Sequence, residues 1–98
     1  MNILELGKTF RALQNEERLN ILRLLHENGR MSVKDIVKAT MFEQATISHH
    51  LKLLKNADLV TVNPEGRFRY YSINFEGFKC IIEAIKIDFK DLVVQSIT

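Results

Sequence analysis

Apolar residues recur at helical spacing through the first third of the chain. They fall every three or four positions at Ile3, Leu6, Phe10 and Leu13. This spacing predicts an amphipathic helix over the first 14 residues, despite the glycine in its middle. A second helix is predicted to begin after Asn15, because asparagine is a good N-cap residue and two acids follow it. This helix is expected to stop at Asn28 and Gly29.

The middle of the chain predicts two short helices that are separated by few residues. Residues 32–35 have the form of a capping box and open a helix that we expect to end near Thr40. The next helix is expected to begin near Glu43, with apolar residues at Ile47, Leu51 and Leu54. Two helices joined in this way are typical of a helix-turn-helix, here over residues 32–57.

Residues 59–73 have the pattern of a β-hairpin. Residues 59–62 predict one strand, residues 64–66 a turn, and residues 67–73 the returning strand. A hairpin that directly follows a helix-turn-helix forms the wing of a winged-helix domain. The pattern therefore predicts a mainly α fold with a small β-hairpin, in the order α-α-α-α-β-β-α, as one domain over residues 1–98.

The last predicted helix is apolar over an unusually wide arc. One stripe consists of Phe78, Ile81, Ile82, Ile85, Phe89, Leu92 and Val93, and a second side adds Cys80, Ala84 and Ile87. A domain of 98 residues has only a modest core, so this helix is expected to face more than its own chain.

Composition adds few constraints. The net charge of +2 does not by itself indicate a nucleic-acid partner, so the placement of the basic residues has to decide. The single cysteine, Cys80, excludes an intramolecular disulfide and a Cys-rich zinc site. No apolar run approaches the roughly 20 residues that cross a bilayer, and the N-terminus lacks a signal-peptide core, so we expect a cytoplasmic protein without a membrane partner.

The polar face of the helix after Glu43 carries side chains that can read DNA. A helical wheel turns Ala45, Ser48, His49, Lys52 and Asn56 away from the apolar side, with Gln44 at the exposed start. The second helix of a helix-turn-helix lies in the major groove, where the Gln44 amide can pair with adenine. Lys52 and Lys55 follow where the helix meets backbone phosphates. The competing interpretation is an ordinary solvated helix face.

The returning strand of the hairpin is basic. Arg67 and Arg69 alternate with Phe68 and Tyr70, so we expect the two arginines to share one face of the strand. Such a face fits a phosphate or minor-groove contact, although charged edge strands also prevent aggregation. Helix and hairpin together favour a protein that binds double-stranded DNA.

Three segments of the chain resemble the ArsR/SmtB family of bacterial winged-helix repressors: FRALQNEERLNILRLL, ATISHHLKLLKNADLV and EGRFRYYSI. The resemblance implies a homodimeric repressor that binds an inverted-repeat operator and leaves it when an effector arrives. It also implies pairing through the first and last helices, over residues 1–14 and 75–98. The expected interface residues are Ile3, Leu6, Phe10, Phe78, Ile82, Ile85, Phe89 and Leu92.

The resemblance also bears on the DNA-binding residues. Gln44, Ser48 and His49 fall on the base-contacting positions of the family, and Arg67 and Arg69 fall on its wing. Glu43 and Ala45 depart from a pattern that often has serine, so the operator sequence does not carry over. The full expected set is Gln44, Ala45, Thr46, Ser48, His49, Lys52, Lys55, Arg67 and Arg69.

This chain lacks the residues that bind metals in many such repressors. Many relatives begin the third helix with a Cys-x-Cys pair, but this chain has Ser32 and Lys34 at those positions. Others use histidines of the last helix, and no histidine follows His50. His26 and His49 also lack ligand-like neighbours, so we expect no metal site and no cofactor.

Cys80 leaves one further hypothesis open. Relatives that sense oxidants use two cysteines, and the first of these positions corresponds to Arg23. One thiol per chain can still be oxidised, although a buried packing residue is the more common role.

Two competing hypotheses of function are a winged-helix module that binds proteins, and an enzyme. The chain lacks a matched nucleophile and base, paired carboxylates and a phosphate-binding loop, which argues against catalysis.

Overall fold

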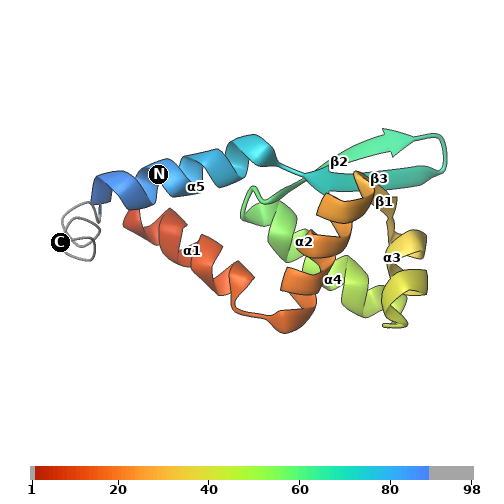
Figure 1. Cartoon of the computed structure of the whole chain (residues 1–98). Helices are drawn as coiled ribbons and strands as arrows, with labels where there is room; N and C mark the ends of the chain where they lie inside the picture. Colours follow the sequence, from red (N-terminus) through yellow and green to blue (C-terminus); the bar gives the residue numbers. More distant parts are fainter. Residues whose placement is uncertain (1, 89–98) are drawn as a thin grey trace.

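The computed structural model describes residues 2–88, which form five helices and a three-stranded antiparallel sheet (Figure 1). In chain order the elements are α1 (Ile3–Leu13), α2 (Glu16–Asn28), β1 (Met31–Ser32), α3 (Val33–Thr40), α4 (Gln44–Asn56), β2 (Val60–Glu65), β3 (Phe68–Ile73) and α5 (Phe75–Asp88). The predicted mainly α fold with a β-hairpin is confirmed.

The helix ends follow local hydrogen bonds. The Asn15 side chain accepts from the backbone N–H of Arg18 at the start of α2, and Gly29, with φ 84°, ends that helix. At α3 the predicted capping box is present, because Ser32 and Asp35 each accept from the other's backbone N–H. These bonds to Ser32 hold the pKa of Asp35 below its ordinary value.

The sheet contains a strand that the sequence pattern did not predict. Met31 and Ser32 form β1, which pairs with Tyr71 and Tyr70 of β3 and gives the strand order β1-β3-β2. Two residues are too few to show the alternation by which strands are recognised. The extra strand fastens the wing to the start of α3.

The turn of the hairpin lies further along the chain than predicted. β2 continues through Pro64, and Glu65 pairs with Phe68, so the turn is Gly66 and Arg67 rather than residues 64–66. Gly66 has φ 60°, a conformation that suits a two-residue hairpin turn. Arg67 therefore lies in the turn, and the prediction that it shares a strand face with Arg69 was wrong.

The core lies between the helices and the base of the sheet. Its fully buried side chains come mainly from α2, α3, α4 and the segment before β2, and include Leu25, Ile36, Ile47, Leu54 and Leu59. Gly77 fixes the start of α5, because a Cβ there would lie 1.8 Å from the backbone oxygen of Asp58. The wing projects at one end of the molecule, and α1 and α5 lie toward the other (Figure 1).

Candidate nucleic-acid interface

Helix α4 has the two faces that the helical wheel predicts. Ile47, Leu51 and Leu54 are buried in the core. The residues of the opposite face are exposed: Gln44, Ala45, Ser48, His49, Lys52 and Lys55. Thr46 is half-buried. All but one of the α4 residues expected to bind DNA are thus open to a partner.

A polar network behind this face holds α4 against the rest of the domain. His50 is 7% exposed, and its Nε2 lies 2.6 Å from a carboxylate oxygen of Glu17. Its Nδ1 lies 3.2 Å from a guanidinium nitrogen of Arg18, which also donates to the backbone oxygens of Ala12 and Arg11 at 2.6 and 3.3 Å. The network therefore joins α4 to both α2 and the end of α1.

The partners in this network determine which ring nitrogen of His50 carries the proton. A guanidinium group can only donate, so Nδ1 must accept from Arg18. Nε2 is then the ring nitrogen placed to donate to Glu17. The network has no local sequence signal, because Arg18 and Glu17 are 32 and 33 positions away from His50.

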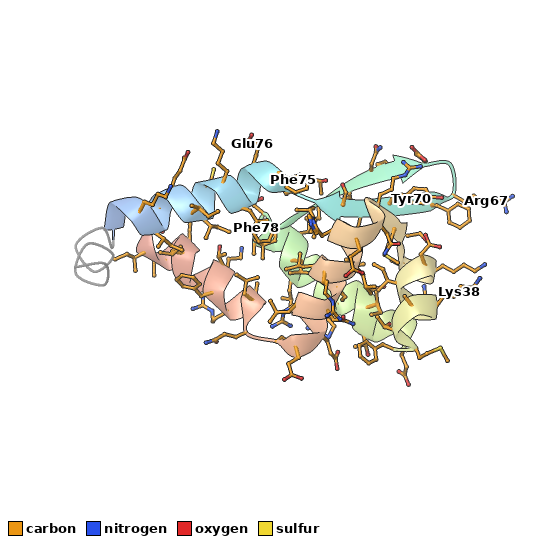
Figure 2. The ribbon with its side chains drawn as sticks, in the orientation of Figure 1. Lys38, Arg67, Tyr70, Phe75, Glu76 and Phe78 are labelled. Atoms are coloured by element: carbon orange, nitrogen blue, oxygen red, sulfur yellow. The ribbon has the colours of Figure 1, made fainter. Side chains whose placement is uncertain are left out.

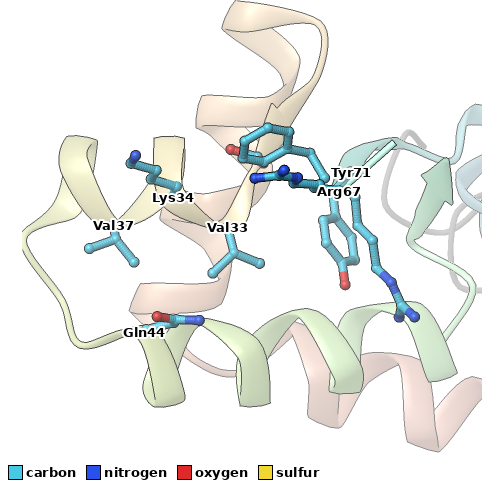
Figure 3. Close-up of a pocket in the computed structure, with 9 residues that line it drawn as sticks. Val33, Lys34, Val37, Gln44, Arg67 and Tyr71 are labelled. Atoms are coloured by element: carbon cyan, nitrogen blue, oxygen red, sulfur yellow. The ribbon is translucent and has the colours of Figure 1, made fainter. Parts of the chain in front are cut away.

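A groove of about 510 Å³ lies between α3, the start of α4 and the wing (Figure 3). Its polar lining includes Gln44, Arg67 and Arg69, three of the residues singled out from the sequence. Val33, Val37, Phe68 and Tyr71 supply apolar surface. The fold therefore brings the first residue of α4 and both wing arginines to one concave surface, even though Arg67 lies in the turn.

Lys34 is a fourth polar group of the groove and was missed as a candidate. From its sequence position Lys34 is only a lost metal ligand, yet it is exposed on α3 and lines the same groove as Gln44 (Figure 3). Ser32 lines the groove as well, and among residues 2–88 no acidic residue does. No local sequence signal marks Lys34, because only the pairing of β1 with β3 brings the start of α3 beside the wing.

The opposite end of the molecule exposes apolar side chains on α1 and α5. Leu4 is 82% exposed, Ile3 75%, Ile82 52% and Phe10 42%. Phe78 and Ile85 are half-buried, whereas Leu6 packs inside the chain's own core. Phe89 and Leu92 lie outside the described residues. Figure 2 shows Arg67 at the tip of the wing, with Phe75 and Phe78 on α5 away from it.

The residues considered for sensing are dispersed. Cys80 is exposed on α5 as a free thiol, so the packing role expected for it is not observed in the single chain. His26 is exposed in the last turn of α2. Within residues 2–88, no group of three or more potential ligands could hold a metal ion. In the same part of the chain, no helix is both long and apolar enough to cross a membrane.

Comparisons with known proteins place these features in a family. Residues 15–62 match the model described as bacterial regulatory protein, arsR family. The chain is 35% identical over 82 residues to a cadmium resistance transcriptional regulatory protein CadC homolog of Staphylococcus aureus, a stretch that covers 84% of this chain and 68% of that protein. The chain belongs to the arsR family of bacterial regulatory proteins. This family consists of transcriptional regulators rather than enzymes.

Further relatives agree with this family. An HTH-type transcriptional regulator of Methanocaldococcus jannaschii is 42% identical over 79 residues, which cover 81% of this chain and 89% of that protein. A homodimeric winged helix-turn-helix DNA-binding domain from Mycobacterium bovis has a TM-score of 0.71 at 29% identity, covering 86% of this chain and 78% of that one. The resemblance to arsR-type winged-helix regulators that the sequence predicts is confirmed.

Proposed function

We propose that this protein is a transcriptional repressor that binds double-stranded DNA as a homodimer. The observation that carries the proposal is the groove between α3, α4 and the wing, because it unites a base-reading amide at Gln44 with the cations Lys34, Arg67 and Arg69. In a helix-turn-helix the second helix enters the major groove with its N-terminal residues against base edges. Gln44 begins α4, which suits that role.

The proposed contacts divide into two classes. Gln44, Ser48 and His49 face base edges, whereas the lysines and arginines neutralise phosphates. The base readers share the exposed side of α4, and the phosphate contacts surround them on α3, the end of α4 and the wing. The proposed interface comprises Lys34, Gln44, Ala45, Thr46, Ser48, His49, Lys52, Lys55, Arg67 and Arg69.

We propose that the exposed apolar residues of α1 and α5 pair two copies of the chain. Isolated apolar side chains are common on surfaces, but here Leu4, Phe10 and Ile82 are exposed on two helices at the same end of the molecule. Their burial in a dimer leaves both α4 helices free. Such a dimer reads an inverted repeat whose half-sites lie roughly 34 to 36 Å apart. A bacterial regulator of this kind acts in the cytoplasm.

The repressor leaves its operator when an effector binds, as the resemblance implies. Ser32 and Lys34 stand where metal-sensing relatives have a Cys-x-Cys pair, and both have other roles in this chain. Ser32 caps α3, and Lys34 lines the groove. We therefore propose an effector other than a metal ion held by that pair.

Binding to the DNA upstream of the protein's own gene tests the proposal. A labelled duplex from that region and a scrambled duplex of equal composition are compared over a range of salt concentrations. Wild-type protein is expected to prefer the native duplex. Gln44→Ala should reduce this preference, and Arg67→Ala should weaken binding to both duplexes while reducing the salt dependence. Equal, weak binding of wild type to both would favour a protein-binding module instead.

A further inference from the structure

One arginine at the start of the sheet contacts both strands of the wing. Arg30, just before β1, donates to both carboxylate oxygens of Glu65 at the end of β2, at 2.7 and 2.9 Å. Because β3 lies between these two strands, the Arg30 side chain has to cross it. Its guanidinium carbon lies 4.3 Å from the centre of the Tyr70 ring on β3. The side chain therefore spans the width of the sheet.

This contact lies beside the groove, because the ring centre of Phe68, which lines the groove, is 6.4 Å from that of Tyr70. Successive strand residues point to opposite faces, so Tyr70 under Arg30 faces away from Tyr71, which lines the groove. Figure 2 shows Tyr70 on β3 near the tip that carries Arg67. Arg30 is not among the residues that line the groove, so it is placed to hold the wing without itself forming the proposed DNA-binding surface.

The ion pair is suited to orienting the wing rather than to stabilising the fold. About half of each side chain is exposed, and ion pairs at such positions contribute little to global stability. Their mutual hydrogen bonds nevertheless raise the pKa of Arg30 and lower that of Glu65. Both groups stay charged at neutral pH, and a bidentate pair fixes their relative orientation.

The charge of Glu65 gives the pair a second effect. Glu65 is the only acid between Asn63 and Tyr70, a segment that carries Arg67 and Arg69. A carboxylate without a partner beside these arginines would compete with phosphates for them and would repel the DNA backbone. Arg30 neutralises it locally, so that the positive charge of the wing tip remains available.

We propose that Arg30 is a positioning residue for DNA binding, which through Glu65 and Tyr70 sets the direction in which the wing presents Arg67 and Arg69. The proposal rests on the DNA-binding function proposed above. It predicts that Arg30 acts through Glu65, so removal of either partner should have the same kind of effect. If Arg30 contacted DNA directly, its contribution to DNA affinity would not depend on Glu65.

Two measurements on the full chain test the proposal, with the variants Arg30→Gln, Glu65→Gln and the double variant. Amide hydrogen exchange of the free protein reports on the wing itself. Arg30→Gln and Glu65→Gln are both expected to speed exchange about threefold at residues 62–70 and to leave α4 unchanged. Arg23→Gln is the matched control, because it removes the same charge from the surface of α2, where Arg23 contacts only Asn20 among the described hydrogen-bond partners.

The second measurement is affinity for the upstream duplex. Arg30→Gln is expected to lower affinity about fivefold and Glu65→Gln about twofold, with the double variant no weaker than Arg30→Gln. Unchanged wing exchange in Arg30→Gln would overturn the proposal, as would Glu65→Gln binding more tightly than wild type while Arg30→Gln weakens. Failure of wild type to bind the duplex overturns the proposed function instead, and hydrogen exchange alone then decides whether Arg30 holds the wing.

Discussion

The two ends of this molecule expose opposite kinds of surface. At the wing end, Lys34, Arg67 and Arg69 surround a groove that no acidic residue of the described part of the chain lines. At the other end, α1 and α5 expose large apolar side chains such as Leu4 and Ile82. A net charge of +2 conceals this division, because acids elsewhere in the chain balance the cations of the groove. The distribution of charge, rather than its sum, carries the functional information.

The two surfaces are separate in space but connected through the core. Arg18 accounts for much of this connection, because it donates to backbone oxygens at the end of α1 and to His50 of α4. The helix proposed to pair two copies is thus linked by hydrogen bonds to the helix proposed to read DNA.

The largest expected effect is at the apolar end. Ile82→Glu introduces a charge where the account places a dimer contact, and should raise the dimer dissociation constant about 100-fold, because the carboxylate loses water on pairing without gaining a partner. Sedimentation equilibrium measures this change. Glu83→Gln, exposed on the same helix, is the control and should leave pairing intact. A wild-type protein that is monomeric at micromolar concentration would refute the assignment of this surface.

His49 and His50 are adjacent in α4 but are expected to have different roles, His49 in DNA binding and His50 in the stability of the domain. His50→Ala should lower the free energy of unfolding by about 2 kcal/mol, because it leaves Glu17 and Arg18 without their shared partner. His49→Ala, at an exposed position, should leave stability within about 0.5 kcal/mol of wild type while weakening DNA binding. Urea unfolding and DNA titration are compared for both variants. Equal stability of the two variants would contradict the supporting role of His50.

Much of the fold could be predicted because its signals are local. Asn15, Ser32 and Gly29 define helix ends through bonds to residues within four positions, and the structure has those ends. The features that the sequence did not predict all depend on residues far apart in the chain. β1 is recognisable only by its pairing with β3, far along the chain, and the partners of His50 lie in α2. Lys34 joins the candidate site for the same reason, since the sheet brings α3 beside the wing.

A smaller effect is expected for Lys34, and it tests whether the groove is a single surface. Lys34→Ala should reduce DNA affinity about fivefold and lower the salt dependence by about one ion per chain, because one phosphate contact is lost. Lys38→Ala is the matched control, since Lys38 is exposed on the same helix but does not line the groove. Anisotropy titrations at several salt concentrations give both quantities. Identical losses for the two lysines would show a diffuse basic surface rather than a specific groove.

The smallest effect is expected at Cys80. The thiol is exposed on α5. On α2, Arg23 stands where thiol-sensing relatives have the other cysteine of the pair. Cys80→Ser should therefore bind the upstream duplex as wild type does, both with and without peroxide. Loss of wild-type binding under peroxide that the serine variant resists would establish a redox switch at the apolar end.

The central claim is that two chains join through their apolar ends and place two reading surfaces on one duplex. Sedimentation velocity of the wild-type protein with the labelled upstream duplex tests it most directly, because the mass of the complex gives the number of chains bound. The account predicts one complex of two chains per duplex that a scrambled duplex of the same length does not form. A complex with a single chain, or equal binding to both duplexes, would contradict it.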